Sequence, residues 1–347
     1  MLMNLRVLTS IVLTLFSFGT PTRSAPVESA GVGANDYNKL VDYAHLTSFA
    51  YCLKRGLTKG KLGSTANCPS KVCKEDRYAK VDIWEVFNFN DWGEVGSGYI
   101  AVDHDTERIL LVFRGTASTR DWFSDMDFKL VPYKPLVYSG KFTKESKKFV
   151  ACDDCKVHRG FYNFLKKNCG GVLNKVSAVK KAHPTYQLVL SGHSLGAALA
   201  LLSGIEFNLM GYQPLIITYA GSKVGNGNFV DFTNRLMDNY TNKLAISSSN
   251  DFKSGYVRVV HKLDIVPSLP PSPLFKHGGF EYYIDKRSLP HTPSDIERRG
   301  DDFSTFNTKR EPKKPSLSKL WPDSMGKYEH THYFIKITGC DSELKDS

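Results

Sequence analysis

Hydrophobic and polar residues follow two different spacings along the chain. Short runs rich in β-branched and aromatic residues predict strands. They cover residues 81–87, 98–103, 108–113, 186–190, 215–220 and 255–261. Runs with helical spacing predict helices over residues 37–53 and 195–210, the second closed by Gly211. The strands at 98–103 and 108–113 form a predicted hairpin around Asp105 and Thr106. From about residue 109 strands alternate with helices, which predicts an α/β fold with a mixed or parallel sheet flanked by helices.

The first 25 residues have the order of a secretory signal peptide. One positive charge precedes an apolar stretch at residues 7–18, and small and polar residues follow as far as Ala25. The apolar stretch is too short to cross a bilayer comfortably. We therefore expect a secreted, extracellular protein, cleaved near Ala25, with residues 26–347 as a single domain. An N-terminal segment that stays attached as an anchor is the alternative.

Residues 286–328 are rich in Pro, Ser, Lys and Asp and show little periodicity, so we predict a long basic surface loop there. The formal net charge of the chain is +11, but its Lys and Arg residues are scattered and match no nucleic-acid-binding motif. We expect no nucleic-acid partner. The basic residues could attract an anionic lipid interface, or they could simply keep the loop solvated.

Cysteine usage agrees with export. In a secreted chain, cysteines are first interpreted as disulfide partners. A zinc site is less favoured because the close cysteine pairs lack histidines at a ligand spacing, and we expect no metal. The odd number leaves at least one thiol free or paired between chains. The seven cysteines are Cys52, Cys68, Cys73, Cys152, Cys155, Cys169 and Cys340. Asn239 begins an N-glycosylation sequon, which also fits a secretory route.

The segment Gly192-His193-Ser194-Leu195-Gly196 has the Gly-x-Ser-x-Gly pattern of a nucleophile elbow. A predicted strand precedes it and a predicted helix follows it. The sharp turn between them needs small residues two positions before and after the serine, and Gly192 and Gly196 meet that need. The helix N-terminus also favours negative charge that develops on a substrate oxygen. Ser194 is therefore the candidate nucleophile.

A serine hydroxyl needs a histidine base, which a carboxylate orients. In hydrolases with such an elbow the chain order is serine, acid, histidine. Asp264 follows the predicted strand at 255–261 and fits the acid. The residues alone leave several candidates for the base. They are His277, His291, His330 and His332.

Four segments together resemble the fungal class 3 lipases, and the resemblance covers residues 43–340. The segments are Val112-Phe113-Arg114-Gly115-Thr116, Gly192-His193-Ser194-Leu195-Gly196, Asp264-Ile265-Val266-Pro267-Ser268-Leu269-Pro270 and His330-Thr331-His332-Tyr333-Phe334. The resemblance implies an α/β-hydrolase fold with a mostly parallel central sheet and a short helical lid. Ala197, where many members have a second glycine, is a mild departure.

The resemblance also implies roles for individual residues. Asp264 would be the triad acid and His330 the base, since the family places its histidine three residues before the Tyr-Phe pair. Thr116 and the backbone N–H of Leu195 would form the oxyanion hole. His158 and His277 would be structural. His193 lies beside the nucleophile, and we interpret it as packing or hydrogen bonding within the elbow.

Further implications of the resemblance concern the lid and the cysteines. Residues 118–126 resemble the family's lid, and we expect Arg120, Trp122 and Phe123 to be lid residues. The alternative is that this segment is a plain surface helix. Cys52 would pair with Cys340, and Cys68 with Cys73. The other three cysteines have no counterpart in the family, and a bridge between Cys152 and Cys155 is a guess.

These expectations add up to a triacylglycerol-type lipase that forms an acyl-enzyme intermediate at a lipid–water interface and needs no cofactor. Peripheral contact with a membrane or an emulsion would follow from such a substrate. One alternative keeps the triad but changes the substrate to a phospholipid or a feruloyl-type ester. Another is a catalytically silent lipid-binding protein, although no triad or oxyanion residue is lost here.

Overall fold

The computed structural model describes residues 32–64, 67–88, 96–116, 128–139, 150–237, 253–299 and 327–340. All of them fall within one compact unit, Gly31–Ser347. The expected signal peptide, the lid residues Arg120, Trp122 and Phe123, and Asn239 lie outside the described residues.

A nine-stranded sheet forms the centre of the fold, in the order β1-β2-β3-β4-β7-β8-β9-β10-β11. The strands from β4 to β10 run parallel to their neighbours, whereas β1 to β4 and the β10–β11 pair are antiparallel. The strands are β1 (Gly60–Lys61), β2 (Val81–Phe87), β3 (Gly98–Asp103), β4 (Arg108–Phe113), β7 (Gln187–His193), β8 (Leu215–Tyr219), β9 (Gly255–His261), β10 (Phe280–Ile284) and β11 (Ile296–Arg299). The parallel centre and its flanking helices confirm the predicted α/β-hydrolase class.

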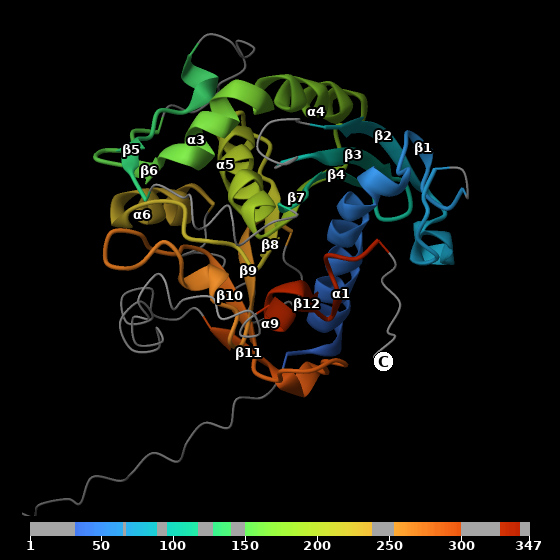
Figure 1. Ribbon diagram of the computed structural model, residues 1–347. Helices are drawn as coiled ribbons and strands as arrows, with labels where there is room; N and C mark the ends of the chain where they lie inside the picture. Colours follow the sequence, from blue (N-terminus) through green and yellow to red (C-terminus); the bar gives the residue numbers. More distant parts are fainter. Residues whose placement is uncertain are drawn as a thin grey trace, which may run out of the picture. The chain divides into compact units, whose positions relative to one another are not determined.

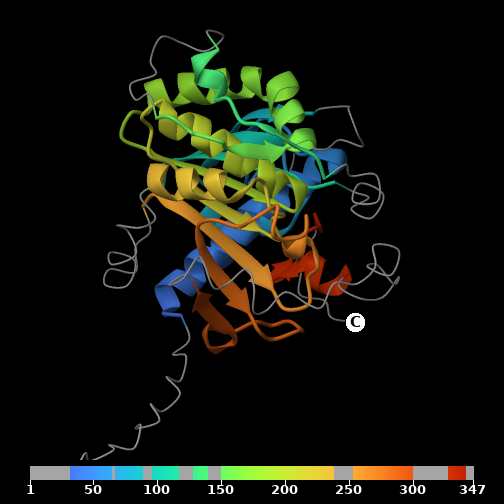
Figure 2. The same cartoon turned by 90° about the vertical axis from the view of Figure 1, so that its left-hand side faces the viewer.

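Helices cover both faces of this sheet (Figures 1 and 2). One face packs against α1 (Ala34–Phe49). The other packs against α3 (Arg159–Phe164), α4 (Gly170–Ala182), α5 (Leu195–Leu209) and α6 (Gly227–Leu236). Side chains of β7 alternate between the two cores: Val189 joins the cluster on the α1 side, and Leu188 and Leu190 join the cluster on the α5 side. A strand buried on both faces reads as a continuous apolar run, as residues 188–190 do.

Smaller elements complete the described chain. Two further antiparallel pairs join β5 (Leu130–Pro132) to β6 (Lys156–His158), and β12 (His332–Tyr333) to β13 (Ile335–Lys336). The single-turn helix α9 (Lys327–Thr331) leads into β12. The short helical turns are η1 (Ala50–Arg55), η2 (Val72–Lys74), η3 (Asp76–Tyr78), η4 (Leu136–Tyr138), η5 (Leu165–Cys169), η6 (Val266–Ser268) and η7 (Pro293–Asp295).

Two sequence predictions need correction at their boundaries. The first helix begins at Ala34 and ends at Phe49, and η1 continues it as a tighter 3₁₀ turn. The strand before the elbow does not stop at residue 190; β7 runs on to His193, because its last residues still pair with β4 and β8. Other predicted strands match within a residue.

The prediction of one surface loop over residues 286–328 is wrong for part of that range. Residues 296–299 form the edge strand β11, which pairs with β10. The sequence did not predict this strand because most of its residues are charged. Ile296 is buried, and Arg299 forms ion pairs with Glu297 and Glu281. Residues 300–326 lie outside the described residues.

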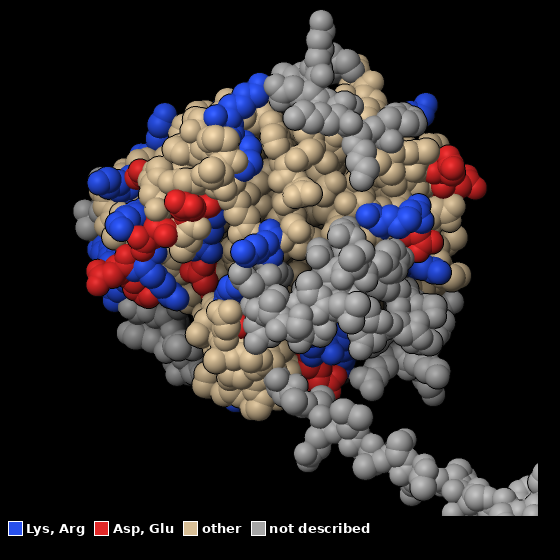
Figure 3. Space-filling model, turned by 180° about the vertical axis from the view of Figure 1, so that it is seen from behind, with Lys and Arg blue, Asp and Glu red and all other residues tan. Residues whose placement is uncertain are grey.

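Charged residues of both signs share the surface. On the face shown in Figure 3, basic side chains lie among acidic ones instead of filling one continuous patch. Ion pairs such as Lys262–Asp285 and Lys286–Asp295 are consistent with this mixing. Within the described ranges, no helix is both long enough and apolar enough to cross a membrane.

Candidate active site

The turn between β7 and α5 consists of a single residue, Ser194. Its backbone lies at φ 56° and ψ −122°, in the left-handed half of conformational space that a non-glycine residue rarely occupies. A Cβ atom on Gly192 would lie 2.3 Å from the Gly196 oxygen, and one on Gly196 would lie 2.4 Å from the Phe113 oxygen. Only glycine fits these two positions, which is the physical basis of the pattern seen in the sequence.

His330 lies next to Ser194 in space, although it lies far away in the sequence. Its Nε2 is 3.1 Å from Ser194 Oγ, and its Nδ1 is 3.0 and 3.1 Å from the two carboxylate oxygens of Asp264. Ser194, His330 and Asp264 are 1%, 2% and 8% exposed. With Nδ1–H donating to the carboxylate, the unprotonated Nε2 faces the hydroxyl and can accept its proton.

Asp264 receives two more hydrogen bonds. The Val266 amide donates to Oδ1 over 3.0 Å, and the Tyr333 hydroxyl donates to Oδ2 over 2.6 Å. Burial and the neighbouring Asp264 hold the pKa of Tyr333 well above its usual range, so this hydroxyl keeps its hydrogen. The sequence predicted no separate role for Tyr333. Its position three residues after His330 was the available signal.

The other candidate histidines make different contacts. His332 Nδ1 lies 2.8 Å from the Tyr328 oxygen, and its ring stacks on Tyr328 with centroids 3.8 Å apart. His277 Nε2 lies 2.6 Å from the Pro267 oxygen. His291 Nδ1 accepts the Phe334 amide hydrogen. Of the four candidates, His330 is therefore the histidine that the structure brings to both Ser194 and Asp264.

The residues expected to form the oxyanion hole flank the elbow. Leu195 is the first residue of α5, and Thr116 follows β4 closely and is buried. Gly115 lies close to the nucleophile, because a Cβ on it would lie 3.1 Å from the Ser194 Cβ. The turn that carries Thr116 therefore passes directly beside the nucleophile. A helix N-terminus and a backbone turn are both suitable donors for a developing oxyanion.

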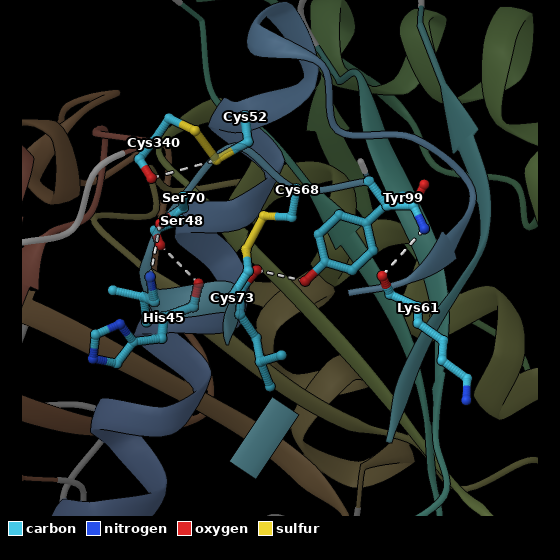
Figure 4. Close-up of a disulfide and its surroundings, with 12 residues drawn as sticks. His45, Ser48, Cys52, Lys61, Cys68, Ser70, Cys73, Tyr99 and Cys340 are labelled. Atoms are coloured by element: carbon cyan, nitrogen blue, oxygen red, sulfur yellow. Dashed lines mark hydrogen bonds between the residues drawn. A yellow bond between two sulfur atoms is a disulfide. The ribbon is translucent and has the colours of Figure 1, made fainter. Parts of the chain in front are cut away.

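Three disulfides are present in the described residues, and two of them are drawn in Figure 4. Cys52 of η1 is bonded to Cys340, and Cys68 is bonded to Cys73. Cys152 and Cys155 form a third bridge. Cys169 is a free, buried thiol whose pKa burial raises to about 12, so it stays protonated. The described residues contain no group of three or more His, Cys, Asp or Glu that could hold a metal ion.

Comparison with known proteins places this chain in a family. Residues 110–273 match the family model described as lipase (class 3). LIH1 of Saccharomyces cerevisiae, named as a candidate lipase, is 34% identical over 313 residues, which span 88% of this chain and 94% of that protein. The secreted mono- and diacylglycerol lipase 2 of Gibberella zeae is 29% identical, over 80% of this chain and 69% of its own length.

Solved structures agree with the sequence comparison. The nonglycosylated LIP2 lipase of Yarrowia lipolytica superposes with a TM-score of 0.68 at 26% identity, covering 89% of this chain and 97% of that one. The mono- and diacylglycerol lipase of Aspergillus oryzae shares the fold, with a TM-score of 0.67 at 24% identity over 89% of this chain and 100% of its own. This chain therefore belongs to the class 3 lipase family and is a carboxylic ester hydrolase.

Proposed function

We propose that this chain is a secreted serine lipase that hydrolyses acylglycerols through a Ser194–His330–Asp264 triad. The observation that carries the proposal is the continuous hydrogen-bond chain from Ser194 Oγ through both ring nitrogens of His330 to the Asp264 carboxylate. Buried and aligned groups of these three types activate a hydroxyl that is otherwise a poor nucleophile.

In the acylation step, His330 Nε2 takes the Ser194 proton while Oγ attacks the ester carbonyl carbon. Asp264 holds the imidazole in position and stabilises the imidazolium that forms. The backbone N–H of Leu195 and the backbone N–H and hydroxyl of Thr116 bind the oxyanion of the tetrahedral intermediate. His330 then gives its proton to the leaving alcohol, and an acyl-enzyme on Ser194 results.

In the deacylation step, His330 removes a proton from water, which attacks the acyl carbon of the Ser194 ester. The second tetrahedral intermediate uses the same oxyanion donors. Collapse of this intermediate returns the proton to Ser194 and releases the fatty acid. No step needs a metal or an organic cofactor.

We propose an acylglycerol at a lipid–water interface as the substrate. Relatives named as mono- and diacylglycerol lipases support this class. The segment with Arg120, Trp122 and Phe123 would act as a short lid, since exposed aromatic side chains favour a lipid surface over water. Residues 1–25 would direct export, which the three disulfides and the relatives named as secreted support. Asn239 would then be open to glycosylation.

The Ser194→Ala variant tests the proposal. We expect hydrolysis of emulsified triacylglycerol to fall by about 10³-fold or more while the melting temperature stays close to that of the wild type. Activity near the wild-type level in a folded Ser194→Ala protein would sink the triad.

Substrate assays with the wild type then separate the alternatives. We expect a rate increase when a triacylglycerol or a partial acylglycerol passes its solubility limit. Faster hydrolysis of phospholipid or feruloyl esters, with no such increase, would reject the acylglycerol substrate and keep the chemistry. No ester hydrolysis at all would leave a lipid-binding protein.

A further inference from the structure

His193, which directly precedes the nucleophile, contacts two other parts of the site. Its ring is 1% exposed. The Nε2 atom lies 2.8 Å from the main-chain oxygen of His330, and the Nδ1 atom lies 2.7 Å from the Tyr51 hydroxyl. The rings of His193 and His330 are 4.8 Å apart between centroids. One buried side chain thus joins the elbow, the segment that carries the base, and η1.

The direction of both hydrogen bonds follows from the chemistry of the partners. A carbonyl oxygen can only accept, so His193 Nε2 carries the hydrogen. Burial and the nearby His330 hold the pKa of His193 well below its usual range, so the ring is neutral and Nδ1 is an acceptor. Burial also raises the pKa of Tyr51, which therefore keeps its hydrogen and donates it. Two successive hydrogen bonds therefore lead from Tyr51 through His193 to the His330 carbonyl.

Tyr51 also contacts the turn that carries the proposed oxyanion donor Thr116. The main chain of Gly115 lies beside the Tyr51 hydroxyl. A Cβ on Gly115 would lie only 2.7 Å from this oxygen. Gly115 is followed by Thr116, the proposed oxyanion donor. Tyr51 therefore packs against the turn at residues 115–116, and its hydrogen bond with His193 connects that turn to the main chain of His330.

We propose that His193 is a positioning residue that holds the base and the oxyanion donor in register around Ser194. This inference rests on the proposed function. His193 transfers no proton; it fixes where the main chain of His330 lies, and through Tyr51 it fixes where the turn with Thr116 lies. A residue that only fills space in the core would not need hydrogen bonds to both Tyr51 and the His330 carbonyl.

Three variants and one control test this role. His193→Leu removes the hydrogen bonds to Tyr51 and to the His330 carbonyl. His193→Gln keeps an N–H donor for the carbonyl, and Tyr51→Phe removes only the hydroxyl that donates to His193. The control is His158→Gln. His158 is equally buried and its Nδ1 accepts hydrogens from Gly160 and Phe161 at the start of α3, with no contact to the triad among its described bonds. Each variant is assayed with a soluble short-chain ester for kcat and KM. A p-nitrophenyl alkylphosphonate is used to measure the rate constant for phosphonylation of Ser194.

We expect His193→Leu to lower kcat and the phosphonylation rate by about 10- to 100-fold, with KM changed less than about two-fold, because misplacement near 1 Å has such costs. His193→Gln should recover part of the loss, and Tyr51→Phe should lose about 3- to 10-fold, the worth of one hydrogen bond. His158→Gln should lower the melting temperature and leave kcat near the wild-type value.

Two results would overturn the inference: a folded His193→Leu with kcat within two-fold of the wild type, or equal losses in His193→Leu and His158→Gln. If His193→Leu does not fold, Tyr51→Phe decides, and an unchanged kcat there rejects the chain of bonds. An inactive Ser194→Ala beside fully active His193 variants refutes this inference alone, whereas an active Ser194→Ala refutes the proposed function.

Discussion

The elbow and the segment that carries His330 are held in place by different means. Main-chain packing fixes the elbow: Gly192 and Gly196 leave no space for a Cβ, and β7 lies between two parallel neighbours. The segment at residues 327–340 contains only α9, β12 and β13, and contacts with distant residues hold it. These contacts include the Tyr333–Asp264 hydrogen bond, the Arg287–Glu329 ion pair and the Cys52–Cys340 disulfide. The nucleophile is thus positioned locally, and its base is positioned by the whole fold.

The largest effect expected from this comparison concerns the two histidines of that segment. His330→Ala should lower kcat/KM by about 10³-fold or more, since it removes the group that accepts the Ser194 proton. His332→Ala removes the stack on Tyr328 and the hydrogen bond with the Tyr328 oxygen, and kcat/KM should stay within about ten-fold of the wild type, because these contacts only help to position the segment. Steady-state kinetics with a soluble ester measures both. A larger loss in His332→Ala would mean that the geometry assigns the wrong base.

The next effect tests how tightly the elbow is packed. Gly196→Ala forces a methyl group against the Phe113 and Arg114 oxygens, at 2.4 and 2.8 Å. We expect about 3 kcal/mol or more of lost unfolding free energy, or failure to fold, because main-chain atoms cannot yield as a flexible side chain can. Gly171→Ala is the matched control, since nothing lies within 4 Å of its Cβ in the first turn of α4.

Gly171→Ala should be neutral or stabilise the protein by about 0.4–1 kcal/mol, because alanine restricts the unfolded chain. Urea unfolding of both variants gives the difference. Similar unfolding free energies for Gly196→Ala and Gly171→Ala would show that the elbow can relax around a methyl group. Tight local packing would then not distinguish the elbow from the segment that carries His330.

This contrast also explains what the sequence could predict. The central strands and α5 were predictable because their apolar runs pack locally into a sheet. Ser194 was predictable because the two glycines and the flanking elements are its sequence neighbours. The residues alone could not choose among four histidines, because the contact of His330 with Asp264 spans 66 residues of chain. Only the resemblance to a family made that choice.

Two features escaped the sequence analysis for similar reasons. The edge strand β11 carries three charged residues among its four, and their pairing with β10 is visible only in three dimensions. The bond from Tyr333 to Asp264 depends on where β12 lies relative to β9. Periodicity reports burial, but it does not report which buried hydroxyl meets which carboxylate.

Removal of the long-range disulfide tests the His330 segment as a whole. Cys52→Ser/Cys340→Ser opens a loop with a sequence separation of 288, whereas Cys152→Ser/Cys155→Ser opens one of only 3. We expect losses of about 2–4 kcal/mol for the first pair and about 2 kcal/mol or less for the second, since loop-closure entropy grows with loop length. Thermal unfolding of both double variants gives the comparison.

The Cys52→Ser/Cys340→Ser variant should also lose activity at temperatures below its unfolding transition, because Cys340 anchors the chain that follows His330. Hydrogen exchange should show faster opening of residues 327–337 in that variant than in the wild type. Equal stability losses in the two double variants, with no change in exchange at these residues, would contradict the view that distant tethers hold the base.

The smallest expected effect concerns the residue before the base. Glu329 is fully buried, and its Oε1 is paired with the Nε of Arg287, whose side chain is 62% exposed. Arg287→Ala leaves the carboxylate buried without this partner, and we expect a loss of about 1–2 kcal/mol of unfolding free energy. Lys80→Ala breaks the exposed Lys80–Asp105 pair and should leave the unfolding free energy almost unchanged. Adding Glu329→Gln to Arg287→Ala removes the buried charge and should recover part of the loss. If the double variant recovers nothing, the arginine acts by packing over α9 and not by neutralising the charge beside His330.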